Sequence, residues 1–218
     1  NTMRSNIICL VGCDGSGKST LAKFMVDELR RRGLRPVLVW SRFNNILSKP
    51  LLALARLLAH SPKETHEDVT FGYHDFEKVF WLRWPFAVLQ AIDVNMAVRC
   101  ALRRARRQGD IVVFERSPWD TLADVILDTG CASLATNRLG RWMVSGVSGP
   151  ACSVLWIDRS KKFILTTRKE LRYDRKLDSK LGIYAMMAKE YQWVRIDNNS
   201  TLEKVCQCLT AWIKEREH

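Results

Sequence analysis

The sequence has little glycine, proline and histidine, and its cysteines form no Cys-x-x-Cys pair. Only 11 glycines and 6 prolines occur in 218 residues, whereas 47% of the residues are hydrophobic and 27% are charged. This composition excludes a collagen-like or disordered chain and is typical of an ordinary globular protein of one domain. Neither the 4 histidines nor the cysteines show the spacing of metal ligands, so no zinc site is predicted.

A secretory leader and a membrane span are also missing. The start, NTMRSN, is polar, and the apolar run that follows is too short and leads directly into a glycine-rich stretch. Residues 79–98 are apolar but interrupted by arginine, proline, aspartate and asparagine. Several of the 7 cysteines lie in apolar runs, where a reduced thiol behaves as a small hydrophobic group. We therefore predict no membrane contact and a cytoplasmic location.

Acidic residues are in deficit. The chain has 35 Lys and Arg against 23 Asp and Glu, a net charge of +12, which attracts anionic partners. Two arginine runs, at 30–32 and 103–107, fit the solvated ends of helices, where cations complement the helix dipole. A nucleic-acid surface is the less favoured alternative, and the net charge by itself does not identify the anionic partner.

Strand and helix patterns alternate along the chain. Residues 7–11 form an apolar run of strand length, and the residues after Lys18 show helical spacing up to Gly33. Further strands are predicted at 35–40, 110–114, 152–157 and 193–196, with helices at 82–108 and 202–215. This order predicts one α/β domain over residues 1–218, with a mostly parallel sheet.

A long insertion separates the second and third predicted strands. Helices are expected at 46–59 and 75–83, joined by the polar linker SPKETHED. An excursion on the carboxyl side of a parallel sheet is where a second ligand would bind. We therefore expect an acceptor-binding excursion at about residues 41–85.

The stretch GCDGSGKST, residues 12–20, matches the pattern Gly-x-x-x-x-Gly-Lys-[Ser/Thr] between a strand and a helix. Glycines allow successive backbone N–H groups to surround phosphate oxygens, and the helix start adds its positive dipole end. Lys18 is expected to bridge the β- and γ-phosphates of ATP, and the Ser19 hydroxyl to hold Mg²⁺. The predicted phosphate-binding residues are Gly12, Cys13, Asp14, Gly15, Ser16, Gly17, Lys18, Ser19 and Thr20.

Two charged residues end the third predicted strand in IVVFERSPWD, residues 111–120. Glu115 and Arg116 would lie at the carboxyl edge of the sheet, beside the glycine loop. Glu115 could hold water on Mg²⁺ or accept a proton from an attacking oxygen, and Arg116 could bind an acceptor phosphate or sugar. An ion pair that merely caps the strand is the alternative.

Three arginines follow the fourth predicted strand in TTRKELRYDRK, residues 166–176. Arg168, Arg172 and Arg175 are four and three residues apart, so one helix would place them on one face. Arginines that close over a transferred phosphoryl group stabilise its charge and exclude water. We interpret residues 166–180 as an arginine-rich lid with catalytic Arg168, Arg172 and Arg175; the alternative is a solvated basic face.

Over nearly its full length the chain resembles the thymidylate kinase family, a branch of the nucleoside monophosphate kinases. Four segments, in this order along the chain, resemble segments of the family: GCDGSGKST, FERSPWD, WIDRS and IDNNSTLEKV. The resemblance implies a P-loop NTPase fold of three layers with five parallel strands flanked by helices. It also implies ATP with Mg²⁺ and γ-phosphoryl transfer to a pyrimidine nucleoside monophosphate, most simply dTMP.

The resemblance also suggests residue roles. Asp14 would face the sugar of the acceptor, and Arg42 would lie near its phosphate, together with Glu115 and Arg116. Arg168 would approach the adenine, beside Asp197 and Asn198 of the segment that enters the last helix.

Some positions depart from the family pattern. Gly15 stands where some members carry a catalytic arginine, which assigns that role to the lid. Glu115 replaces the usual aspartate, and Glu-Arg-Ser resembles the deoxynucleoside kinases instead; these relatives, however, place a glutamate after the second strand, and WSRFNN has none. The helix that brings an arginine to the acceptor phosphate in the family reads LQAIDVNMAVRC here, with Val94 or Asn95 near that place.

The sequence therefore predicts a nucleotide kinase, with Lys18, Glu115 and the lid arginines as catalytic residues and Ser19 with Glu115 as metal ligands. A deoxynucleoside kinase or other small-molecule kinase on the same fold is the first alternative. A nucleotide switch or a nucleic-acid-associated ATPase is the second. A homodimer is left open, with the methionine-rich YAMMAKEY segment as a candidate contact.

Overall fold

The fold is built on one five-stranded, fully parallel sheet. The computed structural model describes residues 3, 5–40, 47, 63–66, 69–72 and 80–217. The strands lie in the order β2-β5-β1-β6-β7. Their bounds are β1 Ile7–Val11, β2 Pro36–Trp40, β5 Ile111–Arg116, β6 Cys152–Asp158 and β7 Val194–Asp197. The predicted α/β class and the five-stranded parallel sheet are confirmed.

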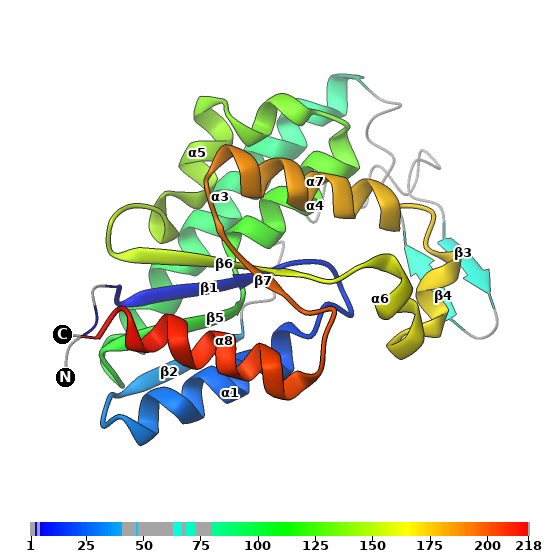
Figure 1. The fold of residues 1–218 in the computed structure, drawn as a ribbon. Helices are drawn as coiled ribbons and strands as arrows, with labels where there is room; N and C mark the ends of the chain where they lie inside the picture. The colour runs from blue at the N-terminus through cyan, green and yellow to red at the C-terminus, as the bar shows by residue number, and fades with distance from the viewer. Residues whose placement is uncertain are drawn as a thin grey trace.

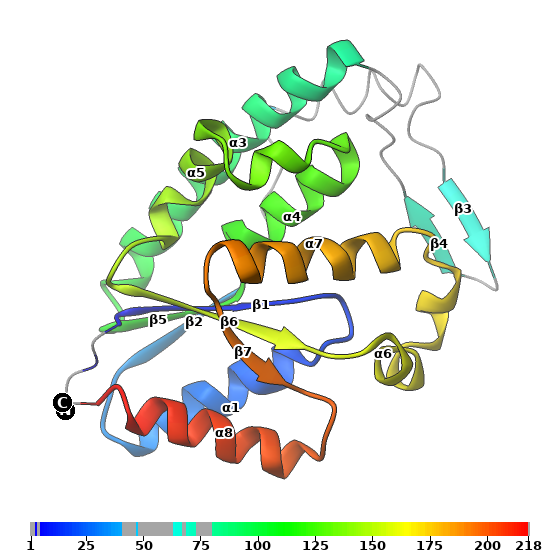
Figure 2. The ribbon, with the colours of Figure 1, turned by 45° about the horizontal axis from the view of Figure 1, so that its top comes forward.

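Helices cover both faces of this sheet and make three layers (Figures 1 and 2). One face carries α1 (Lys18–Arg31) and α8 (Leu202–Lys214). The other carries α3 (Phe80–Ala105), α4 (Pro118–Thr129), α5 (Arg138–Val144) and α7 (Leu177–Glu190). Short 3₁₀ turns at Ala132–Ala135 and Ser145–Val147 flank α5.

The central strand β1 shows why the sheet is covered on both sides. Ile7, Cys9 and Val11 pack into the cluster under α3, α4 and α7, whereas Ile8 and Leu10 pack into the cluster under α1 and α8. All five residues are buried. A strand with two buried faces reads as a continuous apolar run, which is the pattern seen in the sequence.

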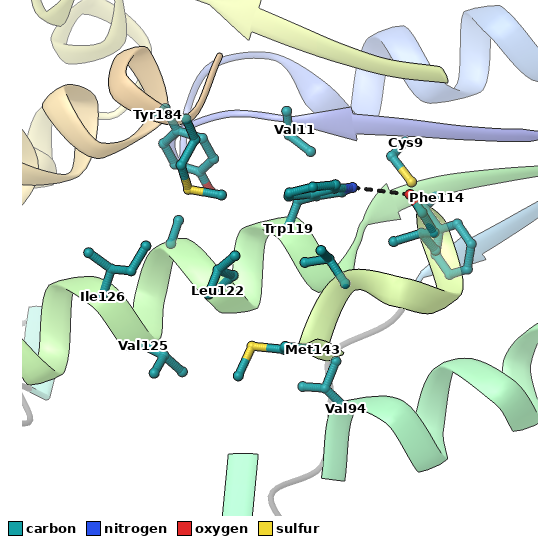
Figure 3. Packing of buried hydrophobic residues seen from close by; sticks show 14 of the residues in the cluster. Cys9, Val11, Val94, Phe114, Trp119, Leu122, Val125, Ile126, Met143 and Tyr184 are labelled. Atoms are coloured by element: carbon teal, nitrogen blue, oxygen red, sulfur yellow. Dashed lines mark hydrogen bonds between the residues drawn. The ribbon is translucent and has the colours of Figure 1, made fainter. Parts of the chain in front are cut away.

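Aromatic rings fill the larger cluster close to β1 (Figure 3). The Trp119 ring lies edge-on to Tyr191 and Trp193, with ring centroids 4.6 and 5.2 Å away. Its indole Nε1 donates a hydrogen bond to the Val147 carbonyl at 3.2 Å, so the buried polar atom is satisfied. This packing fixes the start of α4, which directly follows the carboxyl end of β5.

The insertion differs from its prediction. Two strands, β3 (Lys63–His66) and β4 (Val69–Gly72), form an antiparallel pair; β3 falls within the expected polar linker, and β4 follows it. Thr65, Val69 and Phe71 favour extended backbone, a local preference that the sequence prediction did not include. The helix expected from residue 75 is described only from Phe80, as the start of α3. The predicted helix at 46–59 lies, but for Leu47, outside the described residues, as does Arg42.

Helix α3 is long and apolar enough to cross a membrane by length and composition alone, over Trp81–Ala105. Half of its most apolar window is buried within the fold, where it packs on α4 and α5. Core helices of this kind pass the same test, so the finding is weak evidence for a membrane span.

Candidate functional site

The glycine loop joins β1 to α1 at the carboxyl edge of the sheet. Three of its glycines have positive φ, namely Gly12 at 151°, Gly15 at 79° and Gly17 at 96°. Residues with a side chain rarely adopt these angles, so the glycines are what allow this turn. Gly17 is additionally closed in, because a Cβ there would lie 2.5 Å from Asn198 Nδ2.

Lys18 turns its ammonium group back into the loop. Its Nζ donates to the carbonyl of Gly12 and, at 2.8 Å, to that of Cys13. The residue is buried, and burial lowers the pKa of Lys18 although Asp120 and Asp14 favour its charge. Both of these hydrogen bonds are to neutral carbonyls. A carbonyl stabilises a buried ammonium less than an anionic acceptor does.

Ser19, at the start of α1, contacts Glu115 at the end of β5. The Ser19 hydroxyl donates to Glu115 Oε1. In the described part of the chain no three His, Cys, Asp or Glu residues gather as a ready-made metal site. Mg²⁺ in phosphate-binding sites uses only one or two protein oxygens and takes the rest from phosphates and water, which a hydroxyl and carboxylate pair can supply.

Asp14 is held between two cations on the other side of the loop. Arg116 donates to Asp14 Oδ1, and Lys180 of α7 lies 3.3 Å from Oδ2. Lys180 also lies 2.8 Å from Asp124 of α4. Burial alone would raise the pKa of Asp14, but Lys180 and Arg116 outweigh it and hold the pKa well below its usual range. Asp14 is therefore ionised, and α7 is tied to the glycine loop.

Asp120 connects the glycine loop to the start of α4 and to α7 through hydrogen bonds. Its carboxylate accepts hydrogen bonds from Tyr184 Oη at 2.8 Å, from the Ser117 amide at 2.9 Å and, at 3.4 Å, from the Gly12 amide. Together with Ser117 it forms the capping box that starts α4. Burial raises its pKa, which the charge of Lys18 opposes.

Sequence reasoning missed Asp120, Lys180 and Tyr184. The Ser-x-x-Asp spacing of residues 117–120 could have indicated the cap. Nothing in the sequence joined these residues to the loop.

The end of β7 and the residues after it, which the sequence predicted to lie near an adenine, contact the glycine loop. Asn198 Nδ2 donates to the Ser16 carbonyl at 2.6 Å, and Asp197 accepts from the Asn199 amide at 3.0 Å. Arg159, which follows β6 and was not predicted, donates from its NH1 to the Gly15 carbonyl at 3.0 Å. The predicted Asn198 therefore lies at the loop, whereas Asp197 caps its own turn.

A cavity of about 490 Å³ opens over the loop. Such a volume lies within the usual range of small-molecule sites. Among its charged lining residues four are cationic and two anionic, which favours an anionic ligand. The lining residues are Asp14, Gly15, Gly17, Lys18, Ser19, Thr20, Trp40, Glu115, Arg116, Arg159, Thr167 and Arg168. Exposed Trp40 was not predicted; a bulge in the pairing of β2 with β5 precedes it.

The three predicted lid arginines do not share one helix: Arg172 lies on a 3₁₀ turn, whereas Arg168 and Arg175 lie in the links on either side of it. Helix α6 (Lys161–Thr167) ends before Arg168, a 3₁₀ turn spans Lys169–Tyr173, and α7 begins at Leu177. The expectation of one continuous helical face is therefore wrong, because the chain bends at Arg168 and again at Asp174, where the backbone is extended.

Only Arg168 of the three lines the cavity, where it pairs with Glu170. Arg172 lies over the ring of Tyr173, 5.6 Å from its centroid. Arg175 lines a separate cavity between α4 and α7.

Val94 and Asn95 of α3 stand near the place of the acceptor-binding arginine in the resembled family. Neither residue faces the glycine loop. Val94 is buried in the core. Asn95 Nδ2 donates to the carbonyls of Ala91 and Trp142, at 2.9 and 3.0 Å, so it joins α3 to α5. Neither supplies a charge to the cavity.

A scan against models of protein families finds no match for this chain, and a search of curated proteins finds no relative. The chemistry of the site must therefore be inferred from its own residues and geometry.

Proposed function

We propose that the protein is a P-loop nucleotide kinase that transfers the γ-phosphoryl group of ATP to a nucleoside monophosphate, with dTMP as the expected acceptor. The observation that carries the proposal is the buried ammonium of Lys18, which turns back into a loop whose glycines adopt positive φ angles that residues with a side chain rarely adopt. A phosphate chain would give this cation an anionic partner.

The donor side of the cavity suits ATP. The start of α1 lies at the loop, so its dipole favours the β- and γ-phosphates. Two buried polar atoms at this place, Ser16 Oγ and Arg159 Nε, have no hydrogen-bond partner among the described residues. Buried polar groups without partners are uncommon in proteins, and phosphate oxygens would supply the missing acceptor for the guanidinium.

Mg²⁺ would be held by the Ser19 hydroxyl, with Glu115 next to it. Bound there, the ion would neutralise charge that develops on the phosphate oxygens. Glu115 orients the hydroxyl of Ser19 and can accept hydrogen bonds from water around the ion. These two residues fit the group by their oxygen atoms.

The acceptor side is formed by Asp14, Glu115, Arg116 and Trp40. Ionised Asp14 can accept hydrogen bonds from a sugar hydroxyl, and Arg116 can bind a phosphate while it stays paired with Asp14. Trp40 offers an exposed ring at the rim. Positioning of the acceptor oxygen in line with the γ-phosphorus, plus neutralised charge, supplies most of the catalysis in this reaction class.

The segment at 166–180 acts as the lid in this proposal. Arg168 already lines the cavity, and Arg172 must approach it by a rotation of the short 3₁₀ turn. Closure would exclude water and so prevent hydrolysis of ATP in place of transfer.

A deoxynucleoside kinase is the second candidate, and Glu115 favours it. A carboxylate beside the reacting phosphate can accept the proton of a sugar hydroxyl, which a monophosphate acceptor does not need to lose. The excess of cations in the cavity favours the monophosphate.

The test is a direct assay of ADP formation from ATP and Mg²⁺ against nucleosides and nucleoside monophosphates. We expect turnover with dTMP and none without an acceptor. Lys18→Met should lower kcat by about 10³-fold with the fold intact, whereas Lys23→Met, an exposed lysine on the same helix, should have no effect. Activity on a nucleoside alone would select the second candidate. ATP turnover stimulated by nucleic acid, with a steep salt dependence and no small acceptor, would refute both.

A further inference from the structure

Arg159 contacts the glycine loop from a strand end that does not belong to the lid. Arg159 directly follows β6, and contacts of Asp158 hold the end of this strand in place. The Asp158 carbonyl accepts a hydrogen bond from the Asn198 amide at 2.8 Å, and the Asp158 carboxylate pairs with Arg195 at 2.6 Å. The backbone of β6 also lies against the loop, since a Cβ on Gly12 would be 2.7 Å from the Ile157 carbonyl. The base of the Arg159 side chain is therefore fixed relative to the phosphate-binding turn.

The guanidinium of Arg159 is only partly satisfied. Its NH1 donates to Gly15, and the residue lines the cavity beside Lys18 and Arg168. Its Nε is buried and finds no hydrogen-bond partner in the described part of the chain. Arg159 lines the cavity and has one donor atom without a partner, so an anionic oxygen bound in the cavity could gain charge-assisted hydrogen bonds from its guanidinium.

The glycine loop does not readily accept a side chain at Gly15. Gly15 has a φ of 79°, and a Cβ there would lie 3.1 Å from both Ile164 and Arg168. Any side chain at this position would be strained in its backbone and crowded by α6. The guanidinium that reaches the Gly15 carbonyl instead comes from β6.

The lid arginines occupy other positions. Arg168 is paired with Glu170, and Arg172 and Arg175 lie away from the loop cavity. Arg159 has no carboxylate partner among the ion pairs of the described residues. Its charge is thus available to a ligand before any movement of the lid.

We propose that Arg159 is a catalytic residue that binds the transferred phosphoryl group of the nucleotide from the end of β6. This inference rests on the proposed kinase function. In that reaction the bond from the γ-phosphorus to the β,γ-bridging oxygen breaks and a bond to an acceptor oxygen forms, with ADP as leaving group. Arg159 stays protonated throughout and neutralises charge on the oxygens of the group in transfer.

The experiment compares Arg159→Met with the wild-type protein and with Arg35→Met. Arg35 is an exposed arginine that pairs with Asp110 at 2.8 Å. It precedes β2 and so lies at the amino ends of the parallel strands, away from the carboxyl ends that carry the glycine loop. We expect Arg159→Met to lower kcat for dTMP phosphorylation by about 10²-fold or more, with KM for ATP changed by less than about 5-fold. Arg35→Met should match the wild-type protein.

A binding measurement distinguishes a catalytic role of Arg159 from a purely structural hydrogen bond to Gly15. ADP with Mg²⁺ and aluminium fluoride imitates the phosphoryl group in transfer, and its affinity should fall in Arg159→Met by about the factor lost in kcat. The affinity for ADP alone should change little. Added guanidinium ion should restore part of the activity of Arg159→Ala.

The outcomes are distinct. If the wild-type protein phosphorylates an acceptor and Arg159→Met keeps both kcat and affinity for the fluoride complex, Arg159 has no catalytic role while the kinase function stands. If the wild-type protein neither transfers phosphate nor binds the complex, both proposals fail. Should Arg159→Met unfold, Arg159→Lys retains a donor for Gly15 and undergoes the same comparison, with loss of kcat expected because lysine lacks the planar fork.

Discussion

Replacement of Lys180 by methionine tests the ionic link between α7 and the glycine loop. The Lys180 side chain is 14% exposed and lies 2.8 Å from Asp124 and 3.3 Å from Asp14. Methionine keeps much of the side-chain volume but leaves two carboxylates without this cation. Loss of one partner from a fully buried ion pair costs about 3–5 kcal/mol.

The two carboxylates are less buried than the lysine, and this reduces the expected loss. Asp14 is 39% and Asp124 41% exposed, so water can solvate both once the ammonium is gone. Exposed pairs contribute about 0–1 kcal/mol. We therefore expect a loss of about 2 kcal/mol in the free energy of unfolding, or a fall of about 4–8 °C in Tm for a domain of this size.

Lys161→Met is the matched control. Lys161 pairs with Asp178 of α7 at 2.7 Å, but its side chain is 45% exposed and that of Asp178 is 72% exposed. This pair should contribute less than about 0.5 kcal/mol. Calorimetry at neutral pH and low salt measures both variants.

A double-mutant cycle completes the test. Asp124→Asn together with Lys180→Met should cost less than the sum of the single changes, because each removes the same ion pair. Equal Tm values for the two lysine variants, or strict additivity in the cycle, would refute a stabilising link through Lys180.

Two further predictions concern the loop and helix α4. Gly17→Ala should abolish the proposed ATP binding and lower the free energy of unfolding by about 1–3 kcal/mol, because its Cβ would lie 2.5 Å from Asn198 at a φ of 96°. Gly33→Ala, with a φ of 80° and open space around it, should lower the free energy of unfolding by only about 1 kcal/mol. Equal losses in chemical denaturation would contradict the steric argument. Burial raises the pKa of Asp128 to about 7, opposed by Lys176. A raised carboxyl pKa stabilises the fold at low pH and loses that effect as pH rises through about 7. The free energy of unfolding of the wild-type protein should therefore fall by about 3 kcal/mol from pH 5 to pH 8 relative to Asp128→Asn, and parallel pH profiles would refute this.

Local patterns predicted the framework of the protein well. The apolar run at residues 7–11 became the central strand, and residues 202–215 became α8 within one residue of the predicted end. These signals are local because the periodicity of burial is set by backbone geometry alone. The strands at 63–66 and 69–72 were missed, since each has only four residues and the first lies in a polar stretch, so neither gives a clear alternating pattern.

Of the candidate site, the sequence motif alone could locate only the glycine loop. The spacing of Gly12, Gly17 and Lys18 requires a strand before it and a helix after it, and both are present. The arginine spacing in the segment predicted as a lid was misleading, because the prediction assumed one helix across Asp174. Helical spacing places side chains together only where the helix is continuous.

Tertiary structure alone decided the contacts around that loop. Asp120 meets Tyr184 across 64 residues, Lys180 meets Asp14 across 166, and Arg159 meets Gly15 across 144. Such pairs form because parallel strands bring their carboxyl ends to one edge and because helix packing sets which side chains face that edge. The order of the elements can be read from residue periodicity, but the partners of a charge depend on how those elements pack in space.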